Sequence, residues 1–286
     1  MKRTVPGIIA AVMLSLLAAT GCAGNPMSDE AIEKTVEEIV AANLAVETTT
    51  FDLAMEATVS VQGAAGVEQT SLSGAGSGAV DSTNQTMHMV MSMTTGVPGQ
   101  SPLEIPVEYF LVDGWMYMSV AVPGQGTQWM KMRMPEGMWE QQDQIQQQVD
   151  LLKAADEVNY LGTEEVNGVD CYVVEIVPNL DSIRKMMGQM QGQLPSMGDL
   201  DLSSLDLGQM VKQVSMTQYI AVDGYLFMRT DQHILIEMTP AMLGIPEGEF
   251  DVIVEDITTT MVFGDYNKPA TIQMPQGALA ATQIGA

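Results

Sequence analysis

The sequence predicts an α+β fold dominated by an antiparallel sheet whose strands follow one another along the chain. Apolar residues recur with a period of two through most of its length, as expected for strands with one buried face. Asp113-Gly114, Asn167-Gly168 and Asp223-Gly224 stand between such runs, and these dipeptides are strong signals for tight β-hairpins. Only a few segments show the spacing of an amphipathic helix instead.

The N-terminus has the features of an export signal. A basic pair precedes an apolar stretch from Val5 to Ala19, which is shorter than a membrane-spanning helix. Small residues then lead to Cys22 in a pattern that resembles a lipobox, although Ala19 takes the place of the usual Leu at position minus three. We therefore expect a signal peptide over 1–21, lipidation of Cys22 and a tether over 22–27. The alternative is an ordinary secretory signal with an incidental cysteine.

The first element after the tether is predicted to be a helix. Ser28 is a suitable N-cap, and Ile32, Val36, Ile39 and Val40 follow at helical spacing. From Phe51 the period changes to two, which predicts a strand. Further strands are expected at 70–80, 85–94, 106–112, 115–120, 129–134, 158–166, 169–177, 214–222, 225–230, 234–238 and 250–263.

Two helical segments interrupt this series of strands. The first, over 136–155, places Met138, Gln142, Ile145, Val149 and Leu152 on one face. The second, over 180–191, precedes a Gly-, Ser-, Pro- and Asp-containing stretch at 192–208. We interpret this stretch as a mobile flap or a short helix over the sheet, or as disorder. One domain is expected over 28–276, with a C-terminal tail at 277–286.

Composition narrows the function classes. The chain has 11 basic and 36 acidic residues, a formal net charge of -25, which repels nucleic acid. Its two cysteines are Cys22 and Cys171, so lipidation of the first leaves no intramolecular disulfide. Cys171 lies in an apolar run and is expected to be a buried hydrophobe.

Motifs for catalysis are scarce in this sequence. There are only two histidines, and no nucleophile elbow, zinc-protease motif or phosphate loop is present. The glycine-rich run 74–78 lacks the Lys-Ser/Thr of a phosphate loop and is expected to be a flexible strand or a bulge. The prediction is that the protein is not an enzyme and has no cofactor.

Two segments resemble a known family. The close of the last long strand contains an aromatic residue, an Asp-Tyr turn and two prolines, at Phe263, Asp265, Tyr266, Pro269 and Pro275. The hairpin at 166–174 reads Val-Asn-Gly-Val-Asp-Cys-Tyr-Val-Val. Both patterns resemble LolA/LolB-like half-barrel lipoproteins, including those of the LppX and LprG kind. The resemblance covers 28–276 in outline.

This resemblance implies a strongly curved antiparallel sheet with helices covering its concave face and an apolar cavity between them. It also implies a cell-envelope lipoprotein that faces the extracytoplasmic side and binds or carries a lipid or another hydrophobic ligand. We expect a monomer held at a membrane by the anchor on Cys22.

Methionine is the most informative residue type inside the domain, with 25 in the chain. Many alternate with other residues, so that each group shares one face of a strand. We call these nine residues the methionine set: Met87, Met89, Met91, Met93, Met116, Met118, Met130, Met132 and Met134. They are the candidate ligand-binding residues, with Trp115, Trp129 and Trp139 expected nearby.

Three interpretations of the methionine set remain open. The side chains fill a core, giving a structural or interaction lipoprotein without a ligand, or they form a plastic pocket for a flexible apolar ligand. The third is a Cu(I) site, because Met87-His88-Met89 offers soft ligands. Against copper, His88 points to the opposite face of an extended strand from both methionines.

Overall fold

The computed structural model describes residues 29–63, 66–96, 99, 101–122, 126–135, 139, 142–179, 207–243, 248, 250–270 and 272–284. The expected signal peptide, Cys22, the tether, the helix at 180–191 and all but the last two residues of the stretch 192–208 lie outside them. Within the described ranges, no helix combines the length and apolarity that crossing a membrane requires.

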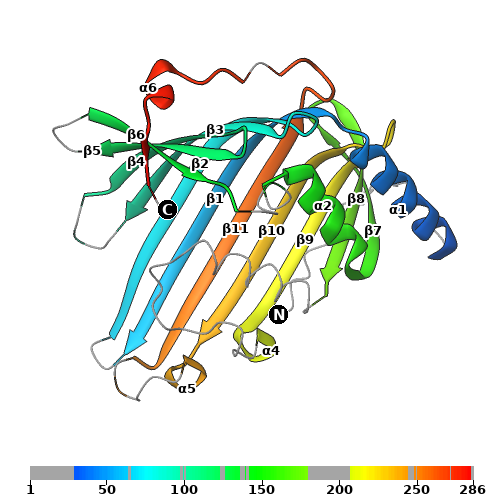
Figure 1. The fold of residues 1–286 in the computed structure, drawn as a ribbon. Coiled ribbons are helices and arrows are strands. Elements are labelled where there is room, and N and C mark those ends of the chain that lie inside the picture. Colours follow the sequence, from blue (N-terminus) through cyan, green and yellow to red (C-terminus); the bar gives the residue numbers. More distant parts are fainter. Residues whose placement is uncertain are drawn as a thin grey trace, which may run out of the picture.

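The described strands form one sheet of twelve, in the order β12-β6-β5-β4-β3-β2-β1-β11-β10-β9-β8-β7 (Figure 1). All neighbours are antiparallel except β12 and β6. The bounds are β1 Thr48–Gly63, β2 Gly66–Asp81, β3 Thr86–Gly96, β4 Leu103–Val112, β5 Trp115–Val122, β6 Gly126–Arg133, β7 Ala155–Val166, β8 Val169–Pro178, β9 Val211–Ala221, β10 Phe227–Met238, β11 Val252–Gly264 and β12 Thr282–Gln283.

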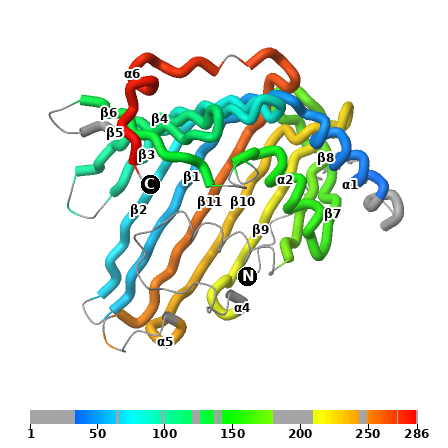
Figure 2. Tube along the Cα trace, viewed as in Figure 1, coloured from blue at the N-terminus to red at the C-terminus, as the bar shows by residue number. Residues whose placement is uncertain are grey.

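The sheet is strongly curved and open, and its two long helices lie on the concave side, as predicted (Figures 1 and 2). Helix α1 spans Asp29–Leu44 and α2 spans Gln144–Lys153. The short helices are α4 Leu207–Met210, α5 Pro240–Leu243 and α6 Gln276–Leu279. The architecture is therefore an α+β half-barrel.

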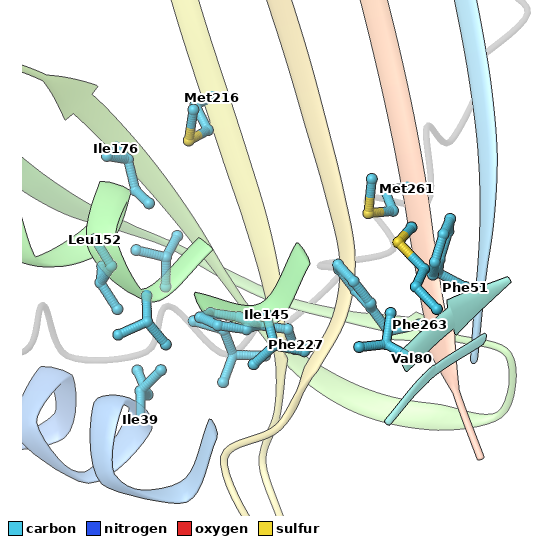
Figure 3. Close-up of a cluster of buried hydrophobic side chains, with 14 of the residues drawn as sticks. Ile39, Phe51, Val80, Ile145, Leu152, Ile176, Met216, Phe227, Met261 and Phe263 are labelled. Atoms are coloured by element: carbon cyan, nitrogen blue, oxygen red, sulfur yellow. The ribbon is translucent and has the colours of Figure 1, made fainter. Parts of the chain in front are cut away.

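The main core lies between the two long helices and the sheet. Ile39 of α1 and Ile145 and Leu152 of α2 meet strand residues such as Phe227 and Ile176 (Figure 3). Asp143 caps the N-terminus of α2, and its carboxylate accepts a hydrogen bond from the Gln146 amide at 3.1 Å. Burial of these apolar side chains fixes the helices over one end of the concave face.

Tight turns connect the strands where the sequence predicts them. Asp113-Gly114 and Asn167-Gly168 both have positive φ at each position, the conformation of a type I′ hairpin. The third turn differs, because its positive φ values fall on Gly224 and Tyr225. It is also longer than predicted, since β9 ends at Ala221 and β10 starts at Phe227.

Two predictions about the elements are corrected, and one open alternative is decided. The runs 225–230 and 234–238 belong to a single strand, β10, in which the polar residues between them continue the pairing with β11. The glutamine on the buried face of α2 is Gln148, whereas Gln142 is only half-buried. Of the two alternatives for the run at 74–78, the strand is confirmed, because the run pairs without interruption on both sides.

The C-terminal residues are part of the fold rather than a tail. Between the end of β11 and the start of α6, no described residue belongs to a strand. The chain instead runs to the other end of the sheet, where α6 packs and β12 pairs with the edge strand β6 (Figure 1). Ala278 and Ala281 are buried there, and the Ile284 amide donates to the Lys131 carbonyl at 2.9 Å.

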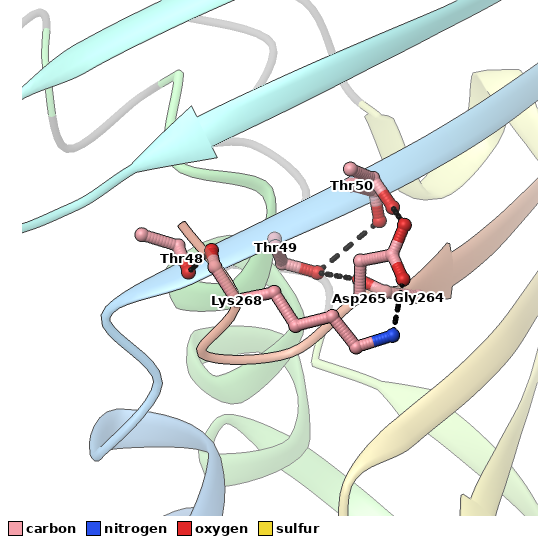
Figure 4. Close-up of polar contacts among 6 residues, drawn as sticks. All are labelled: Thr48, Thr49, Thr50, Gly264, Asp265 and Lys268. Atoms are coloured by element: carbon pink, nitrogen blue, oxygen red, sulfur yellow. Dashed lines mark hydrogen bonds and ion pairs between the residues drawn. The ribbon is translucent and has the colours of Figure 1, made fainter. Parts of the chain in front are cut away.

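The aromatic-Gly-Asp-Tyr motif joins the end of β11 to the start of β1 (Figure 4). Thr48 Oγ1 donates to the Lys268 carbonyl at 2.6 Å, and Thr49 Oγ1 donates to the Gly264 carbonyl at 3.0 Å. Lys268 Nζ lies 2.6 Å from Asp265 Oδ1 and holds the pKa of that carboxyl below its usual value. These bonds thus hold the turn that follows β11 against the start of β1.

Candidate functional site

The strand register brings most of the methionine set onto one face. Met87 pairs with Leu111, Leu111 with Met116, and Met116 with Met132. In the next row, Met89 pairs with Tyr109, Tyr109 with Met118, and Met118 with Met130. Because directly paired residues of an antiparallel sheet lie on the same face, these strands present their methionines together.

This face is the concave one. Met87 and Met89 are buried in the main core, together with Phe51 and Val80 (Figure 3 shows the latter two). Met91, Met116 and Met134 are half-buried against that core, and Met132 at the far end is 36% exposed. The methionine set therefore runs from a closed end under the helices to an accessible end.

A row of glycines lies between β1 and β3 on the same face. Gly74, Gly76 and Gly78 of β2 pair with Met93, Met91 and Met89 of β3 and, on the other side, with Met55, Leu53 and Phe51 of β1. A Cβ at Gly78 would lie 2.4 Å from Phe51 Cζ, and one at Gly76 would lie 2.5 Å from the Val90 carbonyl oxygen. The missing side chains leave the space that the neighbouring Phe and Met side chains occupy.

The apolar surface continues across the centre of the sheet. The register places a further group on the concave face, and most of its members are half-buried: Leu53, Met55, Ala57, Val59, Val61, Val214, Met216, Ile234, Ile236, Met238, Ile253, Ile257 and Met261. Together with the methionine set, these residues give the half-barrel a continuous apolar concave surface.

Ionisable groups on this face are shifted toward their neutral forms. Burial raises the pKa of the Tyr109 hydroxyl to about 12 and also raises the pKa of the Glu255 carboxyl. Both shifts have the same cause, because an apolar environment disfavours a charged group. The concave face is thus a low-polarity environment.

Two of the three tryptophans predicted near the methionine set are on the other face. Trp115 pairs with Arg133 and Trp129 pairs with Ser119, one position out of phase with the methionines. Trp129 lies 5.9 Å from Phe110 and is covered by α6, where a Cβ at Gly277 would lie 3.0 Å from the indole. Period-two alternation separates Trp115 from Met116 and Trp129 from Met130, so these two residues leave the candidate surface. Trp139 packs against the main core.

His88 also lies on the convex face, as its position between Met87 and Met89 predicts. Its Nε2 is 2.9 Å from Glu108 Oε1, and its ring stacks on Phe110 at 4.1 Å. Among the described residues, no group of three His, Cys, Asp or Glu side chains is placed to hold a metal ion. The Met87-His88-Met89 triplet directs its imidazole away from its two sulfurs.

Two hollows accompany these surfaces. A small apolar one of about 20 Å³ lies between α1 and β7–β8, with Val36, Ile39, Val158 and Val174 in its wall. A groove of about 470 Å³ with a mixed polar and apolar lining lies on the convex face and includes Asp52, His88, Asn167 and Asp265. Cys171 is buried, and burial raises the pKa of its thiol, which suits the structural role predicted for it.

No family model and no curated protein sequence matches this chain. Among solved structures, the chain is similar to the lipoprotein LppX of Mycobacterium tuberculosis, at 11% identity and a TM-score of 0.43 over 86% of this chain and 100% of that one. It is also similar to LprF of Mycobacterium bovis, at 10% identity and a TM-score of 0.42 over 88% of this chain and 99% of that one. For a LolA superfamily protein of Nitrosomonas europaea, the identity is 6% and the TM-score 0.22, over 84% of this chain and 94% of that one. LppX and LolA are the proteins that the sequence motifs resemble, and the likeness assigns no ligand.

Proposed function

We propose that this protein is a cell-envelope lipoprotein that binds or carries a lipid, or a similar hydrophobic molecule, on its concave face. The observation that supports it is the continuous, half-buried apolar surface formed by the methionine set and by the central strands. Monomeric proteins seldom leave large apolar surfaces partly accessible unless they bind something there. No catalytic step is part of the proposal.

The predominance of methionine suits a flexible ligand. Its side chain is unbranched and adapts to varied shapes, whereas Leu and Ile hold one shape. Met91 and Met93 are half-buried and pair with glycines of β2, so no β2 side chain confines them on that side. A surface of this kind accommodates acyl chains of different length without a rigid pocket.

Burial of the chain would supply the affinity. Each methylene removed from water contributes roughly 0.8 kcal/mol, so a chain of about a dozen gains several kcal/mol even after the cost of association. The mechanism is shielding: the half-barrel replaces water around the apolar part of the ligand. Attachment through Cys22 would keep the protein beside the membrane that supplies or receives the lipid.

Native mass spectrometry with lipid extraction tests the proposal on residues 22–286 carrying Cys22→Ser. We expect about one lipid per protein. Met91→Asp should lose it, because an inward carboxylate disrupts the apolar surface. Val90→Asp is the matched control, since Val90 is the neighbouring residue on the convex face and is 45% exposed.

Circular dichroism and thermal unfolding establish that both variants are folded. A folded wild-type protein that carries no lipid and takes up neither fatty acid nor phospholipid would overturn the proposal. In that case a filled core without a ligand would account better for the methionine set.

A further inference from the structure

Four uncharged polar side chains adjoin one another within the apolar concave face. Thr230 of β10 pairs with Gln218 of β9, and Gln232, two residues further along β10, pairs with Thr259 of β11. Residues two apart on a strand share a face, so all four lie together. We call Gln218, Thr230, Gln232 and Thr259 the polar patch.

The buried end of the polar patch has unused hydrogen-bonding capacity. Gln218 is fully buried and Thr230 is 1% exposed. The Gln218 Nε2 group donates to Gln148 Oε1 at 3.1 Å, but within the described part of the chain Gln218 Oε1 and Thr230 Oγ1 have no hydrogen-bond partner. An unpaired buried polar atom costs on the order of 1–3 kcal/mol, so this pair is suited to a ligand group that can hydrogen-bond.

The other end of the polar patch is accessible. Gln232 and Thr259 are half-buried, and they pair with each other beside the half-buried Ile257 and Ile234 of the apolar surface. The patch therefore extends from an accessible surface inward toward the two unpaired atoms. A molecule lying on the apolar surface could place one polar group along it.

No basic side chain is directed toward such a molecule from the inward strand positions that the structure describes. At the inward positions of β1–β6 and β9–β11, the described charged residues are Glu68 and Glu255. Five basic side chains of these strands take outward positions: His88, Lys131, Arg133, Arg229 and His233. Lys212 lies in the β9 bulge, and its Nζ is 3.6 Å from Oε2 of the outward Glu237. An anionic head group on this face would lose hydration without gaining a cation, which disfavours its binding.

We infer that the ligand is an uncharged, hydroxyl-bearing lipid whose polar group binds the polar patch while its chain lies on the apolar surface. A hydroxyl fits both unpaired atoms, because it donates to Gln218 Oε1 and accepts from Thr230 Oγ1–H. Lipids whose only head group is a phosphate or a carboxylate are disfavoured by the charges at the described strand positions. This inference rests on the proposed function and adds the class of the ligand.

Binding of a matched lipid pair to the Cys22→Ser mature chain tests the inference. 1-Palmitoylglycerol and 1-palmitoylglycerol 3-phosphate share chain and ester and differ in the phosphate, while hexadecane reports on the apolar surface alone. We expect 1-palmitoylglycerol to bind at least about tenfold more tightly than the phosphate, a ratio that corresponds to about 1.4 kcal/mol.

Two substitutions test the polar patch itself. Thr230→Val and Gln232→Leu should each weaken 1-palmitoylglycerol binding by about tenfold and leave hexadecane binding unchanged, because they remove polar atoms and keep side-chain volume. Thr258→Val is the control, since Thr258 is the exposed neighbour of Thr259 on the convex face.

The outcomes separate the inference from the proposed function. Equal affinity for the two palmitoyl lipids would overturn the uncharged class, and unchanged binding in both patch variants would overturn the patch, as expected if it only holds a buried water. Failure of all three molecules to bind the folded wild-type protein would overturn the proposed function as well.

Discussion

Phe51 of β1 packs directly over Gly78 of β2, so closely that a Cβ at position 78 would lie 2.4 Å from Phe51 Cζ and 2.8 Å from the His88 carbonyl oxygen. Phe51 is 2% exposed and belongs to the main core. The glycine is therefore a packing requirement on the concave face. It lets an aromatic ring of one strand lie across its neighbour.

Gly78→Ala should destabilise the protein by about 1–3 kcal/mol, the usual cost of overpacking a tightly filled core. Gly74→Ala is the matched control, because the nearest atoms to a Cβ there are the ends of two methionine side chains at 3.7 Å. Urea unfolding of both variants measures the difference. Equal free energies of unfolding would show that the close contact with Phe51 is unimportant.

Glu255→Gln should stabilise the protein at neutral pH, by less than about 1 kcal/mol for this half-buried position. Burial raises the pKa of the Glu255 carboxyl above the usual 4.5, so its ionised form is disfavoured in the folded state. The contribution of Glu255 to wild-type stability therefore falls as the pH rises from the pKa of this carboxyl in the unfolded state through its pKa in the folded state. The gain from Gln should be absent near pH 4 and full near pH 7.

Thermal unfolding across this pH range checks the prediction, with Glu56→Gln as the control on the exposed face of β1. A gain that is independent of pH, or that the control reproduces, would contradict the assignment of the effect to burial of Glu255.

Most strands could be predicted from the sequence because one face of each is apolar. The prediction of two strands in place of β10 was wrong for a physical reason. Asp231, Gln232 and His233 are polar and resemble a turn, but in the structure all three pair with β11. Asp231 pairs with Arg229 at 2.7 Å and His233 with Asp256 at 2.8 Å on the convex face, while Gln232 joins the polar patch. Each of these residues also has a partner on β11, which sequence patterns do not reveal: Thr260 Oγ1 donates to Asp231 Oδ1 at 2.9 Å, Gln232 pairs with Thr259, and His233 contacts Asp256.

The candidate site was predicted in part. Period-two spacing grouped the methionines of each strand, but the register between strands was needed to bring them onto one face. The same spacing should have separated Trp115 from Met116. The polar patch was missed because Gln218 and Thr230 lie on different strands, although polar residues at inward positions of alternating strands were the available signal.

Cys22→Ser should abolish lipid attachment. If the lipobox-like sequence is processed as expected, wild-type cells grown with labelled fatty acid will give a labelled protein in the membrane fraction, because a thioether-linked lipid anchors it there. The serine variant cannot form that bond and should carry no label. A wild-type protein that is released unlabelled would instead identify an ordinary secretory signal with an incidental cysteine.

Ala278→Asp should destabilise the protein by about 2–4 kcal/mol, because it forces a charge into a fully buried position. The α6 segment covers Trp129, so the variant should also shift tryptophan emission to longer wavelength as water reaches the indole. Leu279→Asp is the matched control, since the adjacent Leu279 is 62% exposed and should tolerate the same charge. If Ala278→Asp leaves both the unfolding midpoint and the emission unchanged, the C-terminal segment does not pack on the convex face in solution. If only the midpoint falls, α6 stabilises the sheet without shielding Trp129.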